Sequence, residues 1–166
     1  MHRLLLVSVS LFALSVLAHA QETPEPRALA HVFFGGGGTF AEGDAAGTLH
    51  VGGGGEGLIY KGLGAGAELG YLFPSRAAGD GFGILSTNGF YRFTNNSSLQ
   101  KVTPFVTAGY SLGFRDGTAN LVNFGGGVDY WVRDRMGLRL EVRDHVWADR
   151  GPTAHFLMFR VGLVGR

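Results

Sequence analysis

Apolar and polar residues alternate with a period of two through most of the chain after residue 27. The alternation is clearest between 102 and 115, where Val102, Val106 and Tyr110 share one face and Thr103 and Thr107 share the other. Successive side chains of a β-strand point to opposite faces, so this period predicts strands with one apolar and one polar face. Glycine and β-branched residues inside the same stretches argue against helices.

Eight stretches of this kind follow one another, with turn residues between them. Short connections join neighbours that pair antiparallel, so the pattern predicts an all-β fold, an eight-stranded antiparallel up-and-down barrel. The expected strands are 28–38, 48–59, 63–74, 82–94, 102–115, 121–133, 137–148 and 154–164. Tight turns are expected near Tyr60-Lys61, Asn95-Asn96 and Asp134-Arg135, and loops at Thr39–Gly47, Ser75–Gly81, Asp116–Asn120 and Asp149–Thr153.

Glycine is the unusual feature of the composition, with 29 residues in a chain of 166 that is 45% hydrophobic. Many glycines fall on the polar faces, beside Arg and Glu. Glycine weakens a strand that faces water, whereas inside a narrow barrel it leaves room for the long side chains of neighbouring strands. The polar face is therefore expected to line the lumen and the apolar face to contact lipid, as in a transmembrane β-barrel.

Aromatic residues on the apolar face favour the membrane interpretation. They gather toward the expected rims, as in the aromatic girdles of membrane barrels. The predicted girdle is Phe34, Tyr71, Phe73, Phe82, Tyr110, Phe114, Phe124 and Tyr130. The alternation alone also allows a secreted or periplasmic lipocalin-like barrel, whose apolar face would turn inward around a small apolar ligand, and this alternative stays open.

The N-terminus has the pattern of a cleaved signal peptide. His2 and Arg3 give a basic start, residues 4–17 form an apolar run, and Ala18-His19-Ala20 supplies the small-x-small cleavage pattern. The run is shorter than the ~20 residues that a membrane-spanning helix needs. We expect a signal peptide at 1–20, a short periplasmic leader at 21–27 and an outer-membrane β-barrel at 28–166.

Three segments carry a resemblance to a known family: PFVTAGY at 104–110, NFGGGVDY at 123–130 and GLRLEVR at 137–143. With them, the chain from Ala28 to Arg166 resembles the small eight-stranded outer-membrane proteins of bacteria with two membranes, the porin-like OmpA-type and OmpX-type barrels. The resemblance implies a location in the cell outer membrane, contact with outer-membrane lipid and the outer-membrane assembly machinery, and a lumenal ion-pair gate. Such barrels typically end on an aromatic residue, whereas this chain ends on Gly165-Arg166.

Seven charged residues are predicted to point into the lumen. An isolated buried charge costs many kcal/mol, so these side chains are expected to form ion pairs. The expected network is Glu56, Glu68, Asp129, Arg139, Glu141, Arg143 and Arg160. Parity across the turn at 134–135 places Asp129 opposite or diagonal to Arg139. Glu56 and Glu68 are expected to neutralise Arg143 and Arg160.

The sequence does not indicate nucleic-acid binding, thiol chemistry, dinucleotide binding or a metal site. The formal net charge of +1, without a basic stripe, argues against a nucleic-acid partner, and the absence of cysteine excludes disulfides and thiolate sites. Residues 52–57 match a dinucleotide-binding glycine motif, but a strand end rather than a helix follows them. No histidine pair has metal-ligand spacing on one strand, so neither a metal nor a cofactor is expected.

An enzyme is not expected either. Asp144, His145, Asp149 and His155 lie near one predicted rim, but no serine follows His155, and no set of nucleophile, base and orienting group can be assembled. The sequence therefore predicts a non-enzymatic integral outer-membrane barrel, structural or weakly porin-like, with a charged side-chain plug in the lumen. No particular ligand follows from the sequence.

Overall fold

The computed structural model describes residues 28–93, 101–147 and 153–166. The expected signal peptide at 1–20, the leader at 21–27 and the turn at Asn95-Asn96 lie outside the described residues, as does most of the loop expected at Asp149–Thr153. No helix in the described part of the chain is long and apolar enough to cross a membrane.

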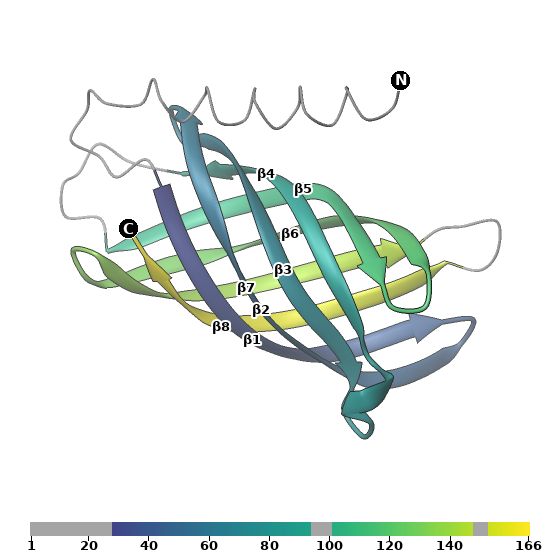
Figure 1. Ribbon diagram of the computed structural model, residues 1–166. Coiled ribbons are helices and arrows are strands. Elements are labelled where there is room, and N and C mark those ends of the chain that lie inside the picture. Colours follow the sequence, from purple (N-terminus) through teal and green to yellow (C-terminus); the bar gives the residue numbers. More distant parts are fainter. Residues whose placement is uncertain (1–27, 94–100, 148–152) are drawn as a thin grey trace, which may run out of the picture.

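Eight antiparallel strands pair in chain order, and the last pairs with the first to close a barrel (Figure 1). The strands are β1 (Ala28–Ala41), β2 (Asp44–Tyr60), β3 (Leu63–Pro74), β4 (Phe82–Arg92), β5 (Val102–Phe114), β6 (Thr118–Arg133), β7 (Met136–Trp147) and β8 (Ala154–Gly165), with one short 3₁₀ turn, η1 (Ala78–Asp80), before β4. The up-and-down architecture predicted from the alternation is confirmed, because each predicted strand overlaps one observed strand.

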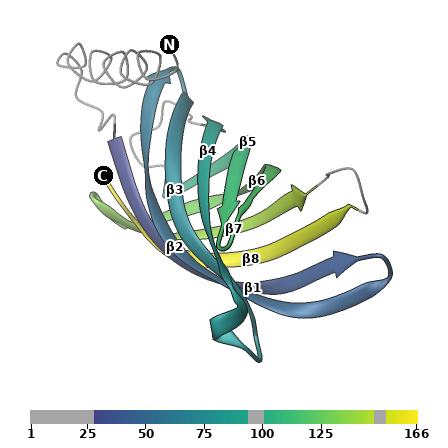
Figure 2. The ribbon, with the colours of Figure 1, turned by 45° about the vertical axis from the view of Figure 1, so that its right-hand side comes forward.

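The strands are staggered around the ring. Following paired residues from Ala30 through β2 to β8 and back to β1 leads to Phe40, ten residues farther along the strand. A stagger of this size tilts the strands by roughly 40° from the barrel axis, and Figure 2 shows them crossing the barrel obliquely. β1 begins and β8 ends at the same end, which we call the terminal end; the opposite end is the distal end.

The hairpin between β1 and β2 corrects the loop expected at Thr39–Gly47. Ala41 pairs with Asp44, so only Glu42 and Gly43 remain unpaired. Both have positive φ, 49° and 91°, as a two-residue type I′ turn requires. The glycines at 35–38 removed the alternation that would have shown the strand continuing. The loop expected at Asp116–Asn120 is also shorter, because β6 already begins at Thr118.

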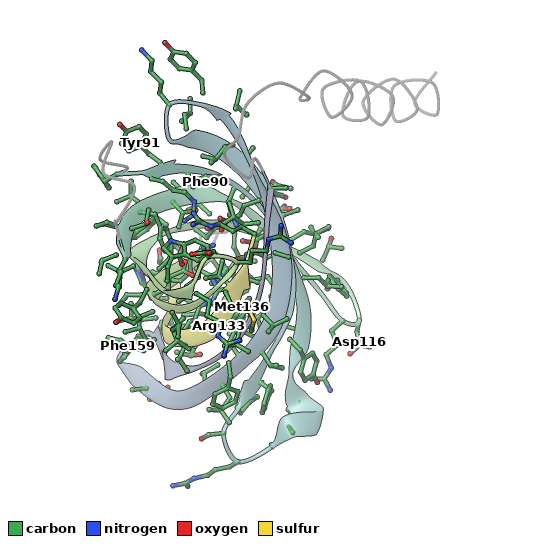
Figure 3. All side chains as sticks on the ribbon, turned by 90° about the vertical axis from the view of Figure 1, so that its left-hand side faces the viewer. Phe90, Tyr91, Asp116, Arg133, Met136 and Phe159 are labelled. Carbon is green, nitrogen blue, oxygen red and sulfur yellow. The ribbon has the colours of Figure 1, made fainter. Side chains whose placement is uncertain are left out.

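The wall of the barrel is inside out relative to a soluble protein. Outward-facing Val122, Leu140 and Phe159 are large, apolar and more than half exposed, whereas inward-facing Asp129 and Arg139 are fully buried. Figure 3 shows side chains filling the interior of the ring, with Phe159 on its outside. This arrangement is the opposite of the apolar lumen that the lipocalin-like alternative requires.

Glycines in the lumen make room for long charged side chains. A Cβ atom at Gly54 would lie 2.8 Å from Glu68 Cγ, and one at Gly125 would lie 3.3 Å from Arg143 Cδ, with strand carbonyls closer still. Such contacts are too short for a larger residue. The glycine content of the polar face is thus a packing requirement of the narrow interior.

Two apolar clusters lie inside the barrel, one toward each end. Leu29, Trp131 and Val164 pack together toward the terminal end. Leu72, Ile84 and Met158 pack together toward the distal end. Between them, the lumen holds polar and charged side chains together with the buried rings of Phe33, Phe90 and Phe105.

The predicted aromatic girdle needs two corrections. Phe82 faces inward, packs against the distal cluster and contacts Phe156 edge to face at 5.8 Å between ring centroids. Phe34 and Phe124 face outward but lie near the middle of β1 and β6, because both strands extend farther toward the distal end than predicted. The other girdle residues face outward: Tyr71, Phe73, Tyr110, Phe114 and Tyr130.

Candidate functional site

The candidate site is the chain of polar side chains along the lumen. β7 shows its order, because the inward-facing residues from the terminal toward the distal end are Arg139, Glu141, Arg143 and His145. All four are at most 4% exposed. The structure places each of the seven charged residues expected in the lumen on an inward face, and it adds Arg92 from the end of β4.

Four residues form the terminal quartet: Glu56, Arg92, Asp129 and Arg139. Asp129 and Arg139 are paired neighbours on β6 and β7, and Arg139 Nε donates to Asp129 Oδ1 over 2.8 Å. Arg139 Nη1 also donates to Glu56 Oε1 across the lumen over 2.6 Å. Arg92 donates to both carboxylates, so each acid of the quartet contacts each base.

Four others form the central quartet: Glu68, Glu141, Arg143 and Arg160. Glu68 contacts both Arg160, at 3.1 Å, and Arg143, at 3.3 Å. Glu141 contacts Arg143 at 2.5 Å and Arg160 at 3.6 Å. Each quartet therefore holds two carboxylates and two guanidinium groups, and its formal charges cancel.

The observed partners differ from those expected for Glu56. Glu68 contacts Arg143 and Arg160, as anticipated, but Glu56 lies at the level of Arg139 and Arg92. The stagger of the strands sets this level, and alternation alone does not give it.

Sequence reasoning missed two members of the network. Arg92 has the same parity as Ser86 and Asn88, and this parity could have indicated that Arg92 faces the lumen. The weak alternation of β4 obscured it. His31 links the quartets, because its Nε2 lies 2.9 Å from Glu68 and its Nδ1 lies 3.8 Å from Glu56.

Aromatic rings pack against the arginines. The guanidinium carbon of Arg139 lies 4.8 Å from the Phe105 ring centroid, and that of Arg160 lies 3.4 Å from the Phe33 ring centroid. A guanidinium group over an aromatic face gains a cation–π attraction that strengthens when water is excluded. The rings also fill the space that water would otherwise take.

A hydrogen-bonded layer lies on the distal side of the central quartet. Asn123 accepts from Arg143 over 3.0 Å and donates to Ser111 over 2.9 Å. The Ser111 hydroxyl lies 2.8 Å from that of Ser86 and 3.1 Å from His145 Nδ1. His50 packs against His145 with ring centroids 5.8 Å apart. The distal apolar cluster follows this layer, so the lumen holds charged, polar and apolar layers in series.

The chemistry of this site is mutual neutralisation. A buried ion pair costs desolvation energy, and removing one partner costs more, because it leaves an uncompensated charge. Within residues 28–93, 101–147 and 153–166, no group of three or more His, Asp or Glu side chains is placed to hold a metal ion. The carboxylates and guanidinium groups of the two quartets form ion pairs with one another.

Comparison with solved structures identifies the architecture. The neisserial surface protein NspA superimposes with a TM-score of 0.65 at 12% identity, over 84% of this chain and 97% of that one. The N-terminal β-barrel domain of Pseudomonas aeruginosa OprF gives 0.59 at 14% identity, over 84% and 96%. This chain has the fold of the small outer-membrane β-barrels. A de novo designed transmembrane β-barrel also matches, with a TM-score of 0.50 at 16% identity over 87% and 98%.

The similarity lies in the fold and not in the sequence. No family model matches the chain, and no curated protein matches it. The family resemblance stated from the three strand segments is therefore supported at the level of architecture, by the neighbours' eight-stranded barrels.

Proposed function

We propose that this protein is a non-enzymatic integral outer-membrane barrel, structural or weakly porin-like, whose lumen is closed by its own charged side chains. One observation carries the proposal: large apolar side chains such as Leu140 and Phe159 are exposed on the wall, while Arg139, Arg143 and Asp129 are buried inside. A wall of this kind is stable in hydrocarbon, and a closed barrel satisfies every backbone hydrogen bond there.

The plug consists of the two quartets. An eight-stranded interior is just wide enough to be filled by side chains. An ion crossing it would have to separate Arg139 from Glu56 and Arg143 from Glu68, and then pass the distal apolar cluster. Each step exposes a charge to a medium of low dielectric constant, so we expect at most small conductance events.

Export and orientation belong to the same proposal. The signal peptide at 1–20 directs the chain across the inner membrane, and the assembly machinery inserts it with the leader at 21–27 in the periplasm. The terminal end then faces the periplasm and the distal end faces outward. The match to outer-membrane barrels of known structure supports this location.

Cell fractionation tests the location. The protein should stay in the outer-membrane pellet after an alkaline wash and should show a heat-dependent shift on gels, as closed membrane barrels do. Recovery in the soluble fraction would reject the proposal and favour the lipocalin-like alternative.

Conductance across a planar bilayer tests the plug. Wild-type protein should show small events at most. The E68A variant should conduct more, because it leaves Arg143 and Arg160 with Glu141 alone. T87A is the matched control, since Thr87 lies one residue from Ser86 on β4 and faces outward. A wide wild-type pore, or an E68A trace identical to that of T87A, would reject the plug.

A further inference from the structure

A polar pair lies on the outer wall of the barrel. His155 Nδ1, on β8, lies 2.8 Å from Asp144 Oδ2, on β7. Both residues have outward parity: Asp144 shares its face with Val142 and Val146, and His155 shares its face with Leu157 and Phe159. The pair therefore belongs to the lipid-facing surface and not to the lumenal network.

Asp144 lies within the paired part of the wall, three residues before Trp147 at the distal end of β7. Its paired neighbours are Phe124 on β6 and Leu157 on β8, and Phe124 is half exposed on the wall. We consider the described strand residues that face outward and lie at least three positions from a strand end. Asp144 is the only Asp, Glu, Lys, Arg or His among them. Its surroundings on the wall are otherwise apolar.

A carboxylate in this position is costly. Charged side chains on the lipid face destabilise membrane barrels, increasingly so toward the midplane, and ionisable groups at membrane depth generally mark functional sites. Pairing with His155 reduces the cost but does not remove it, and a leucine pair would avoid it altogether. Stability therefore gives no reason for the pair.

The pair has one nitrogen left for a ligand. Asp144 uses Oδ2 to hold Nδ1 of His155, and the Asp144 side chain is 13% exposed, whereas that of His155 is 47% exposed. His155 Nε2 is thus the ring nitrogen available at the surface. A held imidazole can donate to, or accept from, an oxygen of a bound molecule.

An apolar groove lies beside Asp144 toward the terminal end. Its volume is about 420 Å³, and it is lined by Val142, Gly126, Val128, Leu140, Phe159 and Val161. Val142 is the next outward-facing residue from Asp144 on β7 in the direction of the terminal end. A second groove, of about 370 Å³, lies on the other side of Phe159, along Leu157, Gly38 and Phe40, and Phe40 is the paired neighbour of His155.

We propose that Asp144 and His155 form a lipid-binding site on the barrel wall. An acyl chain of a lipid in the distal leaflet lies in the groove at Val142, and His155 Nε2 binds an ester, hydroxyl or phosphate oxygen of the same lipid. The inference rests on the proposed function, because it requires the wall to be in a membrane. Hollows behind a projecting Phe159 fit a narrow flexible chain better than the convex wall of a second barrel.

Native mass spectrometry of the purified, folded protein with added phosphatidylethanolamine tests the site. Wild-type protein should retain bound lipid, and H155L and D144L should reduce its affinity about tenfold, as expected for losing one hydrogen bond. V142W, which fills the groove, should have the same effect. T87L and L85W are the matched controls, because they make similar changes on the outward face of β4.

Stability provides the second readout. H155L and D144L should unfold at equal or higher urea concentration than wild type, because they remove polar groups from the lipid face. Equal lipid retention by all variants would overturn the proposed lipid site. A wild-type dimer that is lost in H155L would also overturn it, because the pair would then bind a second copy of the chain. A soluble protein would instead reject the proposed function itself, as judged by the alkaline wash.

Discussion

Asp129 and Arg139 face each other on β6 and β7, and Arg139 Nε donates to Asp129 Oδ1 over 2.8 Å inside the barrel. The two strands are joined by a tight turn at Asp134-Arg135. One local hairpin therefore positions an acid and a base next to each other without any contact across the lumen. Glu56 and Arg92 complete the quartet only when β2 and β4 join the ring.

Removing Arg139 should destabilise the barrel strongly. The R139M variant keeps an unbranched side chain but leaves Asp129 and Glu56 with Arg92 as their one remaining guanidinium partner in the quartet. Breaking a buried pair in this way costs about 3–5 kcal/mol. Urea unfolding of protein refolded into lipid vesicles measures the change. The double variant R139M/D129N should lose less than the sum of the single losses, and strict additivity would show that the pair is not coupled.

The lipid face should tolerate charge according to depth. L140R places an arginine on the exposed outer wall in the middle of β7 and should cost about 2–4 kcal/mol. V132R, near the terminal end of β6, should cost about 0–1 kcal/mol. The same vesicle unfolding assay compares them. Equal costs would mean that the membrane does not cover this wall as proposed.

The two glycines of the β-hairpin turns should differ in sensitivity. Gly43 and Gly62 both have positive φ, so alanine at either position should cost about 1 kcal/mol for the backbone alone. At Gly62 the new Cβ would also lie 2.3 Å from the Arg92 carbonyl oxygen, whereas at Gly43 it would meet nothing within 4 Å. G62A should therefore lose clearly more stability than G43A, and the reverse order would contradict the turn geometry.

Surface labelling should report the orientation. Gly79, in the distal loop between β3 and β4, is open to solvent, and Lys61 forms the turn at the terminal end. The natural chain has no cysteine, so G79C and K61C each carry a single label site. A membrane-impermeant maleimide should label G79C in intact cells and K61C only after lysis. The opposite pattern would place the terminal end outside.

Alternation predicted the strands well where the two faces differ most. β5 and β7 combine apolar outward residues with Thr103, Thr107, Arg139 or Arg143 facing inward, and their bounds agree with the prediction to within one residue at each end. β1 and β2 were predicted too short, because glycine has no side chain and a run of glycines therefore shows no alternation between an apolar and a polar face. β4 was assigned the wrong phase at Phe82, because apolar residues line the lumen near the distal end.

The partners in the lumen could be predicted only in part. Parity gives the face of a residue but not its height in the barrel. The height depends on the stagger that carries Ala30 to Phe40 around the ring, and the stagger is the sum of eight strand registers. An error in one turn, such as that at Glu42-Gly43, changes which residues meet across the lumen. The contacts of Glu56 with Arg92 and Arg139 therefore needed the three-dimensional structure.

Ring closure also has a kinetic consequence. β1 and β8 are at opposite ends of the barrel sequence, yet Ala30 pairs with Gly165. Contacts between residues so distant in sequence form late and slow folding, because the whole intervening chain must be ordered first. Until β8 arrives, β1 presents an unpaired edge on which another chain can add a strand. The interval before the ring closes is therefore when this chain is most prone to aggregate.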